Sequence, residues 1–536
     1  MLSLITLLAP AVGCFVLFRM RERDDADRER IRRTASAFVT ISLIASLVMW
    51  WSYDTGGERY QNVIDVAWAP SLGIGFRLGT DGISIAMVVL TSVVIWAGCY
   101  VSRSIKDRVK EHYILLLALV TGVFGVFLSL DLFFFYFFYE MAVIPMYLLI
   151  GVWGSRAAQY SKEYATMKLT LYLTTGAVFA LVGLLAVYYQ GSEALQAQGL
   201  LKAGERTFDM RLLSQAVLSA GFQKAWFPVV FLGFACIVPM WPLHSWSPIG
   251  HAAAPSSVSM LHAGVLMKLG AYGILRLGFD ILPVGAHHWM GWVAVLCCMN
   301  ILYGGLVAMA QRDMKFIIGF SSSSHMGYVL LGLATVAAGS GEAATAGISG
   351  AVFLMFAHGI MTALAFGLIG WFYDQTHTRV VDDLGGMLKQ MPFVGVCFVI
   401  MAMASAGLPG FANFASELLV IVGAWRSSFT LAGTGLTVPG WVPTVAAVWG
   451  IVISATYLLR AVRDAWFGPA NPRWEGLRDA TARRERLPFA GLILVLTLTG
   501  CFPRTIVDTI KDGVRHVMQR QEERKAEQPV HDGGPR

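Results

Sequence analysis

The sequence predicts an all-α polytopic membrane protein with about fourteen transmembrane helices. Of its 536 residues, 56% are hydrophobic and only 14% are charged, whereas about a quarter of the residues of soluble domains are charged. The mean hydropathy is +0.60. Apolar runs of about 17 to 25 residues, enough to cross a ~30 Å hydrocarbon core as helices, recur along the whole chain.

Each predicted span begins and ends where polar residues, Gly or Pro interrupt an apolar run. The spans cover residues 2–19, 36–53, 81–102, 112–129, 131–151, 167–189, 225–246, 255–277, 288–309, 315–338, 346–372, 392–427, 442–465 and 488–503. No basic segment precedes the first run, which ends at Arg19. This fits a transmembrane helix better than a cleaved signal peptide.

Lys and Arg residues predict the orientation. They cluster in every second connection, at 19–33, 106–110, 156–168, 312–315 and 473–486. The positive-inside rule places these connections in the cytoplasm and both termini outside. The segment after Pro503 is also basic, and we expect either an amphipathic helix on a membrane or a neighbour, or a solvated tail.

Composition argues against nucleic-acid binding and against a cofactor in this chain. The net charge of +7 comes from short connections between apolar runs, with no aromatic-rich basic patch. No GxGxxG sequence follows a predicted strand, and no P-loop is present. The cysteines form no CxxC pair and lie mostly in apolar runs, as small buried residues do. They are Cys14, Cys99, Cys236, Cys297, Cys298, Cys397 and Cys501.

Two predicted spans contain helix breakers. Pro239, Pro242 and Pro248 punctuate the segment 234–255, and Gly407 and Pro409 interrupt the run 392–427. Irregular backbone at membrane depth is tolerated where it is buried in protein or lines a wet cavity. Broken helices in two halves of a chain are typical of transport sites.

Ionisable residues lie deep in the apolar runs, although each costs roughly 2.5 to 3.5 kcal/mol on insertion scales. A single one has ordinary explanations: a lysine can snorkel, a histidine can be a core residue, and a glutamate can cap a helix. Several together are typical of a proton pathway, and their spacing is not that of metal ligands. They are Glu140, Lys268, His325, His358 and Glu417, with His262 as a further candidate.

Such a set suits proton transfer for a physical reason. A carboxylate and an ammonium group in a low dielectric keep each other charged, so separating them drives proton uptake by one and release by the other. Histidine titrates near neutral pH and can pass the proton between them.

Four segments carry a resemblance to a known family. "FYEMAVIPMYLLIGVWG", "PMWPLHSWSPIGHAAAPSSVSMLHAGVLMKLGAYGILR", "QRDMKFIIGFSSSSHMGYVLLG" and "GLPGFANFASELLVIVGAW" resemble the M-type (chain 4-type) subunits of respiratory complex I, within the antiporter-like, Mrp-type family. The similarity runs in order from about residue 80 to 470.

The resemblance implies fourteen helices, two inverted five-helix repeats with broken seventh and twelfth helices, and a hydrophilic axis. It divides the chain into 1–110 (helices 1–3), 111–285 and 286–470 (the two repeats), 471–510 (a loop and helix 14) and 511–536 (a basic extramembrane tail). NADH, FMN, iron–sulfur clusters and quinone would belong to other subunits. L-, N- and K-type subunits would be the partners, in a bacterial-type inner membrane.

The resemblance also implies roles for individual residues. Glu140 is the fifth-helix carboxylate and Lys268 the central lysine of the eighth helix. His325 and His358 are histidines of the tenth and eleventh helices. Glu417 is the terminal carboxylate of the twelfth helix.

The chain departs from the family pattern at two positions. Ile237 stands where the seventh helix usually carries a lysine that pairs with the glutamate, and Ile249 replaces a common aspartate. We expect Lys168 to pair with Glu140 instead, or His262 to supply a replacement titratable group. Two other functions stay open: a subunit of a multi-subunit sodium/proton antiporter, and a structural member of the arm that does not pump.

Overall fold

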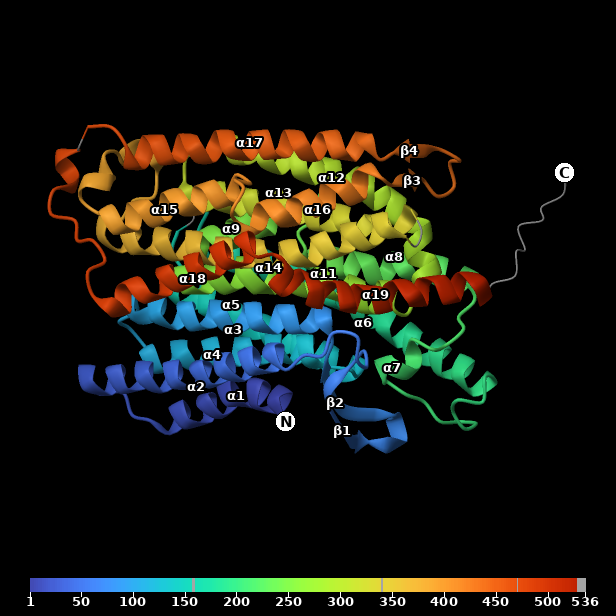
Figure 1. Cartoon of the computed structure of the whole chain (residues 1–536). Helices are drawn as coiled ribbons and strands as arrows, with labels where there is room; N and C mark the ends of the chain where they lie inside the picture. Colours follow the sequence, from blue (N-terminus) through green and yellow to red (C-terminus); the bar gives the residue numbers. More distant parts are fainter. Residues whose placement is uncertain (157–159, 339–340, 470, 528–536) are drawn as a thin grey trace.

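The computed structural model describes residues 1–156, 160–338, 341–469 and 471–527, with side chains described up to residue 523. Twelve helices in these ranges are long and apolar enough to cross a membrane, or up to thirteen if one bent pair is a single span. The helices lie side by side, and most connections gather at the two ends of the bundle (Figure 1). The predicted helical, multi-pass fold is confirmed.

The observed spans lie close to the predicted ones. They are α1 (Leu2–Arg19), α2 (Asp25–Trp51), α3 (Gly82–Val101), α4 (Val109–Leu128), α5 (Leu132–Trp153), α6 (Lys162–Ala197), α8 (Ala220–Ile237), α12 (Pro283–Ala310), α13 (Met314–Ala334), α14 (Glu342–Thr376) and α17 (Trp441–Trp466), and a span made of α10 (Ser256–Leu261), η3 (His262–Leu266), α11 (Met267–Gly273) and η4 (Ile274–Phe279). Short helical turns are α7 (Met210–Leu213), η1 (Pro70–Leu72), η2 (Ser102–Ser104), η5 (Thr335–Ala338), η6 (Val381–Asp383), η7 (Met387–Lys389) and η8 (Pro472–Trp474).

The spans differ in how much of their surface other helices cover. The span Ser256–Phe279 and α14 are enclosed on all sides, and α3 and α13 almost so. By contrast, fewer than half of the residues in the most apolar segments of α1, α2 and α6 are buried. Since a charged side chain is costly in lipid, the enclosed helices are the ones that can carry ionisable residues.

Two predicted spans are interrupted, as expected. After α8 the chain runs through turns at 238–245 to a short helix, α9 (Trp246–Ala253). The run 392–427 forms α15 (Pro392–Ser405) and α16 (Ala412–Trp425), each of 14 residues and too short to cross a bilayer alone. Gly407 and Gly410, in the second break, have φ angles of 73° and 104°, which glycine adopts without a steric penalty.

Two small antiparallel hairpins were not predicted. β1 (Gln61–Ala69) pairs with β2 (Ile74–Thr80), and β3 (Ser428–Thr430) pairs with β4 (Thr437–Pro439). Both lie in connections between helices, at one end of the bundle (Figure 1). The first hairpin is short and half-exposed, so its alternation of apolar and polar residues is a weak signal beside the long apolar runs.

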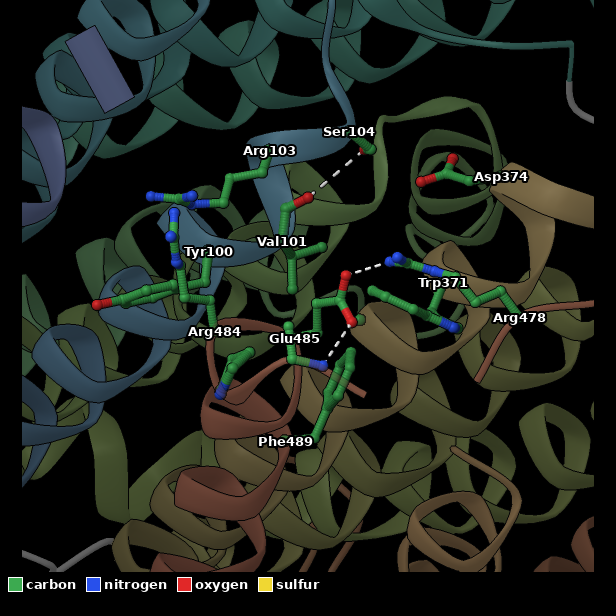
Figure 2. Close-up of a pocket in the computed structure, with 13 residues that line it drawn as sticks. Tyr100, Val101, Arg103, Ser104, Trp371, Asp374, Arg478, Arg484, Glu485 and Phe489 are labelled. Atoms are coloured by element: carbon green, nitrogen blue, oxygen red, sulfur yellow. Dashed lines mark hydrogen bonds and ion pairs between the residues drawn. The ribbon is translucent and has the colours of Figure 1, made fainter. Parts of the chain in front are cut away.

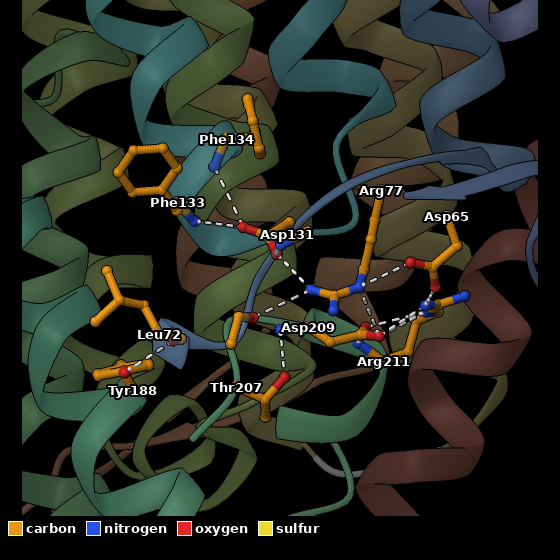
Figure 3. A network of polar contacts seen from close by, with 12 residues as sticks. Asp65, Leu72, Arg77, Asp131, Phe133, Phe134, Tyr188, Thr207, Asp209 and Arg211 are labelled. Carbon is orange, nitrogen blue, oxygen red and sulfur yellow. Dashed lines mark hydrogen bonds and ion pairs between the residues drawn. The ribbon is translucent and has the colours of Figure 1, made fainter. Parts of the chain in front are cut away.

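An ion-pair network fastens the first hairpin to the start of α5 (Figure 3). Arg77 on β2 lies 2.6 Å from a carboxylate oxygen of Asp131 and 3.4 Å from one of Asp209. Asp131 also accepts hydrogen bonds from the backbone N–H groups of Phe133 and Phe134, and so caps α5. The hairpin therefore helps to hold the helix that carries Glu140.

The segment after Pro503 forms a helix that packs on the bundle, and not a solvated tail, over its described residues. α18 (Arg483–Cys501) meets α19 (Arg504–Glu527) at an angle of 71°. α19 buries Ile506, Ile510 and Val514 and contacts α3 and α14, so the amphipathic helix packs on its own chain. The last residues of the predicted tail, 528–536, lie outside the described residues.

Candidate functional site

Lys268 lies in one of the two spans of the described chain that are enclosed on all sides. It follows the π-helical turn η3 and precedes a second one, η4, and π-helical turns inside α-helices are frequent at functional sites. The side chain is fully buried. Its Nζ donates a hydrogen bond to the backbone oxygen of Ala263 and lies 2.8 Å from Nδ1 of His358 on α14.

Two histidines link Lys268 to Glu417. The rings of His358 and His325 have centroids 5.2 Å apart, and Nε2 of His325 lies 3.5 Å from Oε1 of Glu417. None of the four residues is more than 2% exposed. We call Lys268, His358, His325 and Glu417 the buried relay; it joins four residues that lie on four separate spans.

The hydrogen bonding of His325 sets the direction of its free nitrogen. Nδ1 lies 2.8 Å from the backbone oxygen of Ser321, and a carbonyl oxygen can only accept, so the hydrogen of the neutral ring is on Nδ1. In this tautomer Nε2 is the nitrogen that faces Glu417. This arrangement allows a proton to pass between the carboxyl group and the ring.

Glu417 lies against the break between α15 and α16. A Cβ added at Gly407 would lie 3.0 Å from Oε2 of Glu417, so the glycine leaves room for the carboxylate. The break therefore serves the site in two ways: it accommodates a positive φ angle, and it makes space beside a buried acid.

We expect Gly407→Ala to lower turnover of the assembled enzyme several-fold, because the methyl group displaces Glu417. The left-handed backbone adds a cost of roughly 1–2 kcal/mol. Gly410→Ala is the matched control, since it carries a similar backbone strain but has no atom within 4 Å of the added carbon. Steady-state activity of the two purified variants separates the effects; equal losses would contradict the steric explanation.

A hydroxyl chain continues from His325 to α17. The Tyr457 hydroxyl donates to Ser321 Oγ at 2.6 Å and lies 3.2 Å from Ser454 Oγ. All three residues are buried. Sequence reasoning missed them, although Ser321 opens the serine run "SSSSH" that precedes His325.

A second histidine pair lies between α9 and the span that carries Lys268. His262, in η3, and His251, on α9, have ring centroids 4.2 Å apart and are fully buried. Within the described part of the chain, none of their four nitrogens has a hydrogen-bond partner. Nearby, the buried Lys315 donates to the backbone oxygen of Ala254, which follows α9, at 2.7 Å. His251 and Lys315 were missed because neither lies in the middle of a long apolar run.

Glu140 is placed differently from the buried relay. It is half-buried on α5, and its hydrogen-bonding neighbour is Tyr136, one turn earlier. Among the described residues, no cationic nitrogen lies within 4.0 Å of its carboxylate. Lys168 points over the ring of Tyr164, 5.9 Å from its centre, so the expected pairing with Glu140 is not observed. Ile237 is buried at the end of α8.

The comparison with known proteins assigns the chain to a family. Residues 129–438 match the family described as NADH:quinone oxidoreductase/Mrp antiporter, TM. The chain belongs to this family. The matched segment contains the whole buried relay, Glu140 and both helix breaks.

Relatives of this antiporter-like protein cover nearly its full length. Over 520 residues it is 34% identical to NADH-quinone oxidoreductase subunit M of Rhodobacter capsulatus. The match covers 97% of this chain and 96% of the relative. It is 32% identical over 511 residues to NAD(P)H-quinone oxidoreductase chain 4 2 of Thermosynechococcus vestitus, covering 95% and 90%. Both organisms are bacteria, and a bacterial inner membrane fits this antiporter-like chain.

Solved structures share the fold. A chain of respiratory complex I from Thermus thermophilus with bound NADH superposes with a TM-score of 0.81 at 24% identity, covering 97% of this chain and all of that one. A chain of the Mrp complex from Dietzia sp. gives a TM-score of 0.78 at 19% identity, covering 98% and 99%. Within the described part of this antiporter-like chain, no group of three or more His, Cys, Asp or Glu side chains could hold a metal ion.

Proposed function

We propose that this chain is the M-type, proton-translocating membrane-arm subunit of a respiratory NADH–quinone oxidoreductase. The observation that carries the proposal is the buried relay from Lys268 to Glu417, in a chain of this family that resembles named M subunits over its full length. Four ionisable groups at membrane depth are too costly to keep for packing alone.

The relay moves a proton in steps between neighbouring groups. Lys268 as an ammonium can release a proton to His358, whose Nδ1 lies 2.8 Å away. The ring centroids of His358 and His325 are 5.2 Å apart, and Nε2 of His358 has no hydrogen-bond partner among the described residues, so a step between the two rings would need a ring movement or a bridging water. His325 can then protonate Glu417. Tyr457 and the serines beside it offer a continuation on α17. A change in the charge of one member shifts the proton affinity of the next.

The first half of the pathway is altered in this chain. Without a lysine at position 237, either Lys168 would have to pair with Glu140, or His262 would supply a replacement titratable group. We favour His262, because it lies on the same span as Lys268 and its nitrogens have no hydrogen-bond partner among the described residues. The two repeats, 111–285 and 286–470, would each contribute one broken helix.

Partner subunits would supply the electron-transfer chemistry and cover Glu140. Phe137, Ile144 and Tyr147 form an exposed apolar stripe on α5 around this glutamate, and a carboxylate in open lipid is unfavourable. A neighbouring membrane-arm subunit of the L, N or K type would bury this stripe. NADH, FMN, iron–sulfur clusters and quinone would be bound by other subunits.

The proposal is tested by measuring protons translocated per NADH oxidised, in proteoliposomes that contain the purified complex. We compare the wild type with Ile237→Lys, and with Ile237→Lys combined with Glu140→Gln. A full proton ratio in the wild type would mean that the relay works without the seventh-helix lysine. A low proton ratio in the wild type, which Ile237→Lys raises and the added Glu140→Gln lowers again, would mean that the wild-type chain does not translocate protons.

Sodium transport distinguishes the antiporter alternative. Sodium movement that persists in the absence of NADH and quinone would indicate a sodium/proton antiporter subunit and would contradict the proposed function. Proton uptake that depends on both substrates would support it.

A further inference from the structure

A groove opens at the basic end of the bundle between α2, α3 and α18. Its volume is about 640 Å³. Four arginines line it: Arg33 on α2, Arg103 on η2, and Arg483 and Arg484 at the start of α18. An adjoining cavity of about 430 Å³ shares Tyr100, Arg103 and Arg484 with it, and Figure 2 shows this second cavity.

The positive charge of the groove is only partly neutralised within the chain. Glu29 lies near three of the arginines, with its Oε1 3.0 Å from Arg33 and 3.4 Å from both Arg103 and Arg484. One carboxylate thus serves three guanidinium groups, and Arg483 adds a fourth. The side chains of Arg33 and Arg484 are 68% and 64% exposed, so both can reach a further anion.

Two buried polar atoms of the groove have no hydrogen-bond partner within the described ranges of the chain. Ser36 Oγ and Arg103 Nε each lack a hydrogen-bond partner among the described residues, and both residues line the groove. Ser36 is only 9% exposed. A buried donor without a partner costs roughly 1–3 kcal/mol, and an anion with several acceptor oxygens can satisfy both.

The wall below the arginines is apolar. Ala37 and Ile41 follow Arg33 by one and two turns of α2, and Leu487 follows Arg483 by one turn of α18. Eight residues of helix cover about 12 Å, so the wall descends from the arginines toward the hydrocarbon core. Exposed Ile44 and Leu47 extend it further along α2.

We propose that this groove binds one anionic phospholipid, with its phosphate among Arg33, Arg103, Arg483 and Arg484 and an acyl chain along Ala37, Ile41 and Leu487. Basic pockets between membrane helices on the cytoplasmic side suit anionic headgroups, and guanidinium groups bind phosphate oxygens through paired hydrogen bonds. The lipid would also tie α2 to α18, two helices that are far apart in sequence. A free phosphate ion shares the headgroup chemistry but leaves the apolar wall uncovered.

The test counts lipids retained by the purified whole complex, using native mass spectrometry after equilibration with phosphatidylglycerol, with phosphatidylcholine, or with inorganic phosphate. We expect the wild type to retain one more phosphatidylglycerol than Arg33→Gln/Arg484→Gln. Arg21→Gln/Arg473→Gln is the matched control, because it removes two arginines from the same face outside the groove, and it should retain the wild-type number. Arg33→Lys/Arg484→Lys should restore retention in part.

Other variants keep the proposal falsifiable if the double arginine variant fails to assemble. Leu487→Trp fills the apolar wall while all four arginines remain, and we expect it to lose the same lipid. Equal phosphatidylglycerol counts in all variants, or equal retention of phosphatidylcholine at this site, would overturn the proposal. If millimolar inorganic phosphate displaces the phosphatidylglycerol, and Leu487→Trp does not change the number of lipids retained, the site would be assigned to free phosphate. A high-yield cross-link from Leu487→Cys to a neighbouring subunit would assign it to a protein partner instead.

Discussion

Lys268→Ala is expected to lower NADH-driven proton translocation and quinone reductase turnover by at least about tenfold. The residue is the lysine of the buried relay and the proposed proton donor to His358, and proton transfer by a positioned side chain typically contributes 10²- to 10⁴-fold to rate. Its removal also leaves His358 Nδ1 and the Ala263 oxygen without their hydrogen-bond donor. The enzyme should still assemble, because the loss of one buried donor costs only about 1–3 kcal/mol.

Turnover and proton translocation of Lys268→Ala are measured in proteoliposomes beside two comparison variants. Lys202→Ala removes a lysine whose side chain is 88% exposed and should behave as the wild type. Lys268→Arg keeps a positive charge that does not deprotonate in proteins; we expect it to assemble and to remain slow. Normal translocation in Lys268→Arg would show that only the charge matters, and would remove Lys268 from the set of groups that exchange protons.

Glu417→Gln is expected to have an effect of similar size. Within the described relay, Glu417 is the one carboxylate, and in the proposed pathway it receives the proton from His325, whose Nε2 lies 3.5 Å away. Glutamine keeps the shape of the side chain and one acceptor oxygen but cannot take up a proton, so packing beside Gly407 is preserved. A loss of proton translocation therefore reports on chemistry rather than on the stability of the fold.

The measurement is again the proton ratio and turnover of the reconstituted complex. Glu342→Gln is the matched control, since it makes the same change at a side chain that is 96% exposed. Glu417→Asp keeps the acid on a shorter side chain and should retain part of the activity. Full activity in Glu417→Gln would contradict a proton-carrying role for this residue.

The residues of the relay were predictable because their signal is local. Lys268, His325, His358 and Glu417 are each a polar group inside an apolar run, and the energetic cost of such a position is visible in the sequence without knowledge of any neighbour. The breaks at 238–245 and 406–411 were predictable for the same reason, since Pro and Gly act on their own backbone.

Contacts between helices were not predictable in this way. The sequence does not show that the ring of His251 lies 4.2 Å from the ring of His262 on another element. Nor does it show that the Tyr457 hydroxyl donates a hydrogen bond to Ser321 on α13. Lys168 was expected to pair with Glu140, but the rotation of α6 turns its amine over Tyr164. These outcomes depend on which face each helix presents to its neighbours, and one apolar run does not reveal that when all its faces are apolar.

The amino-acid sequence by itself determined that this protein crosses the membrane many times and holds ionisable groups within the bilayer, and where its helices break. Hydrophobic length, charge and backbone chemistry are properties of single segments, so they can be read along the chain. Only the tertiary structure decided that four of these groups form one buried relay, that Glu140 stands apart on a half-exposed face, and that arginines from α2, η2 and α18 share one groove. Each of these depends on distances between segments far apart in sequence, which the packing of whole helices sets.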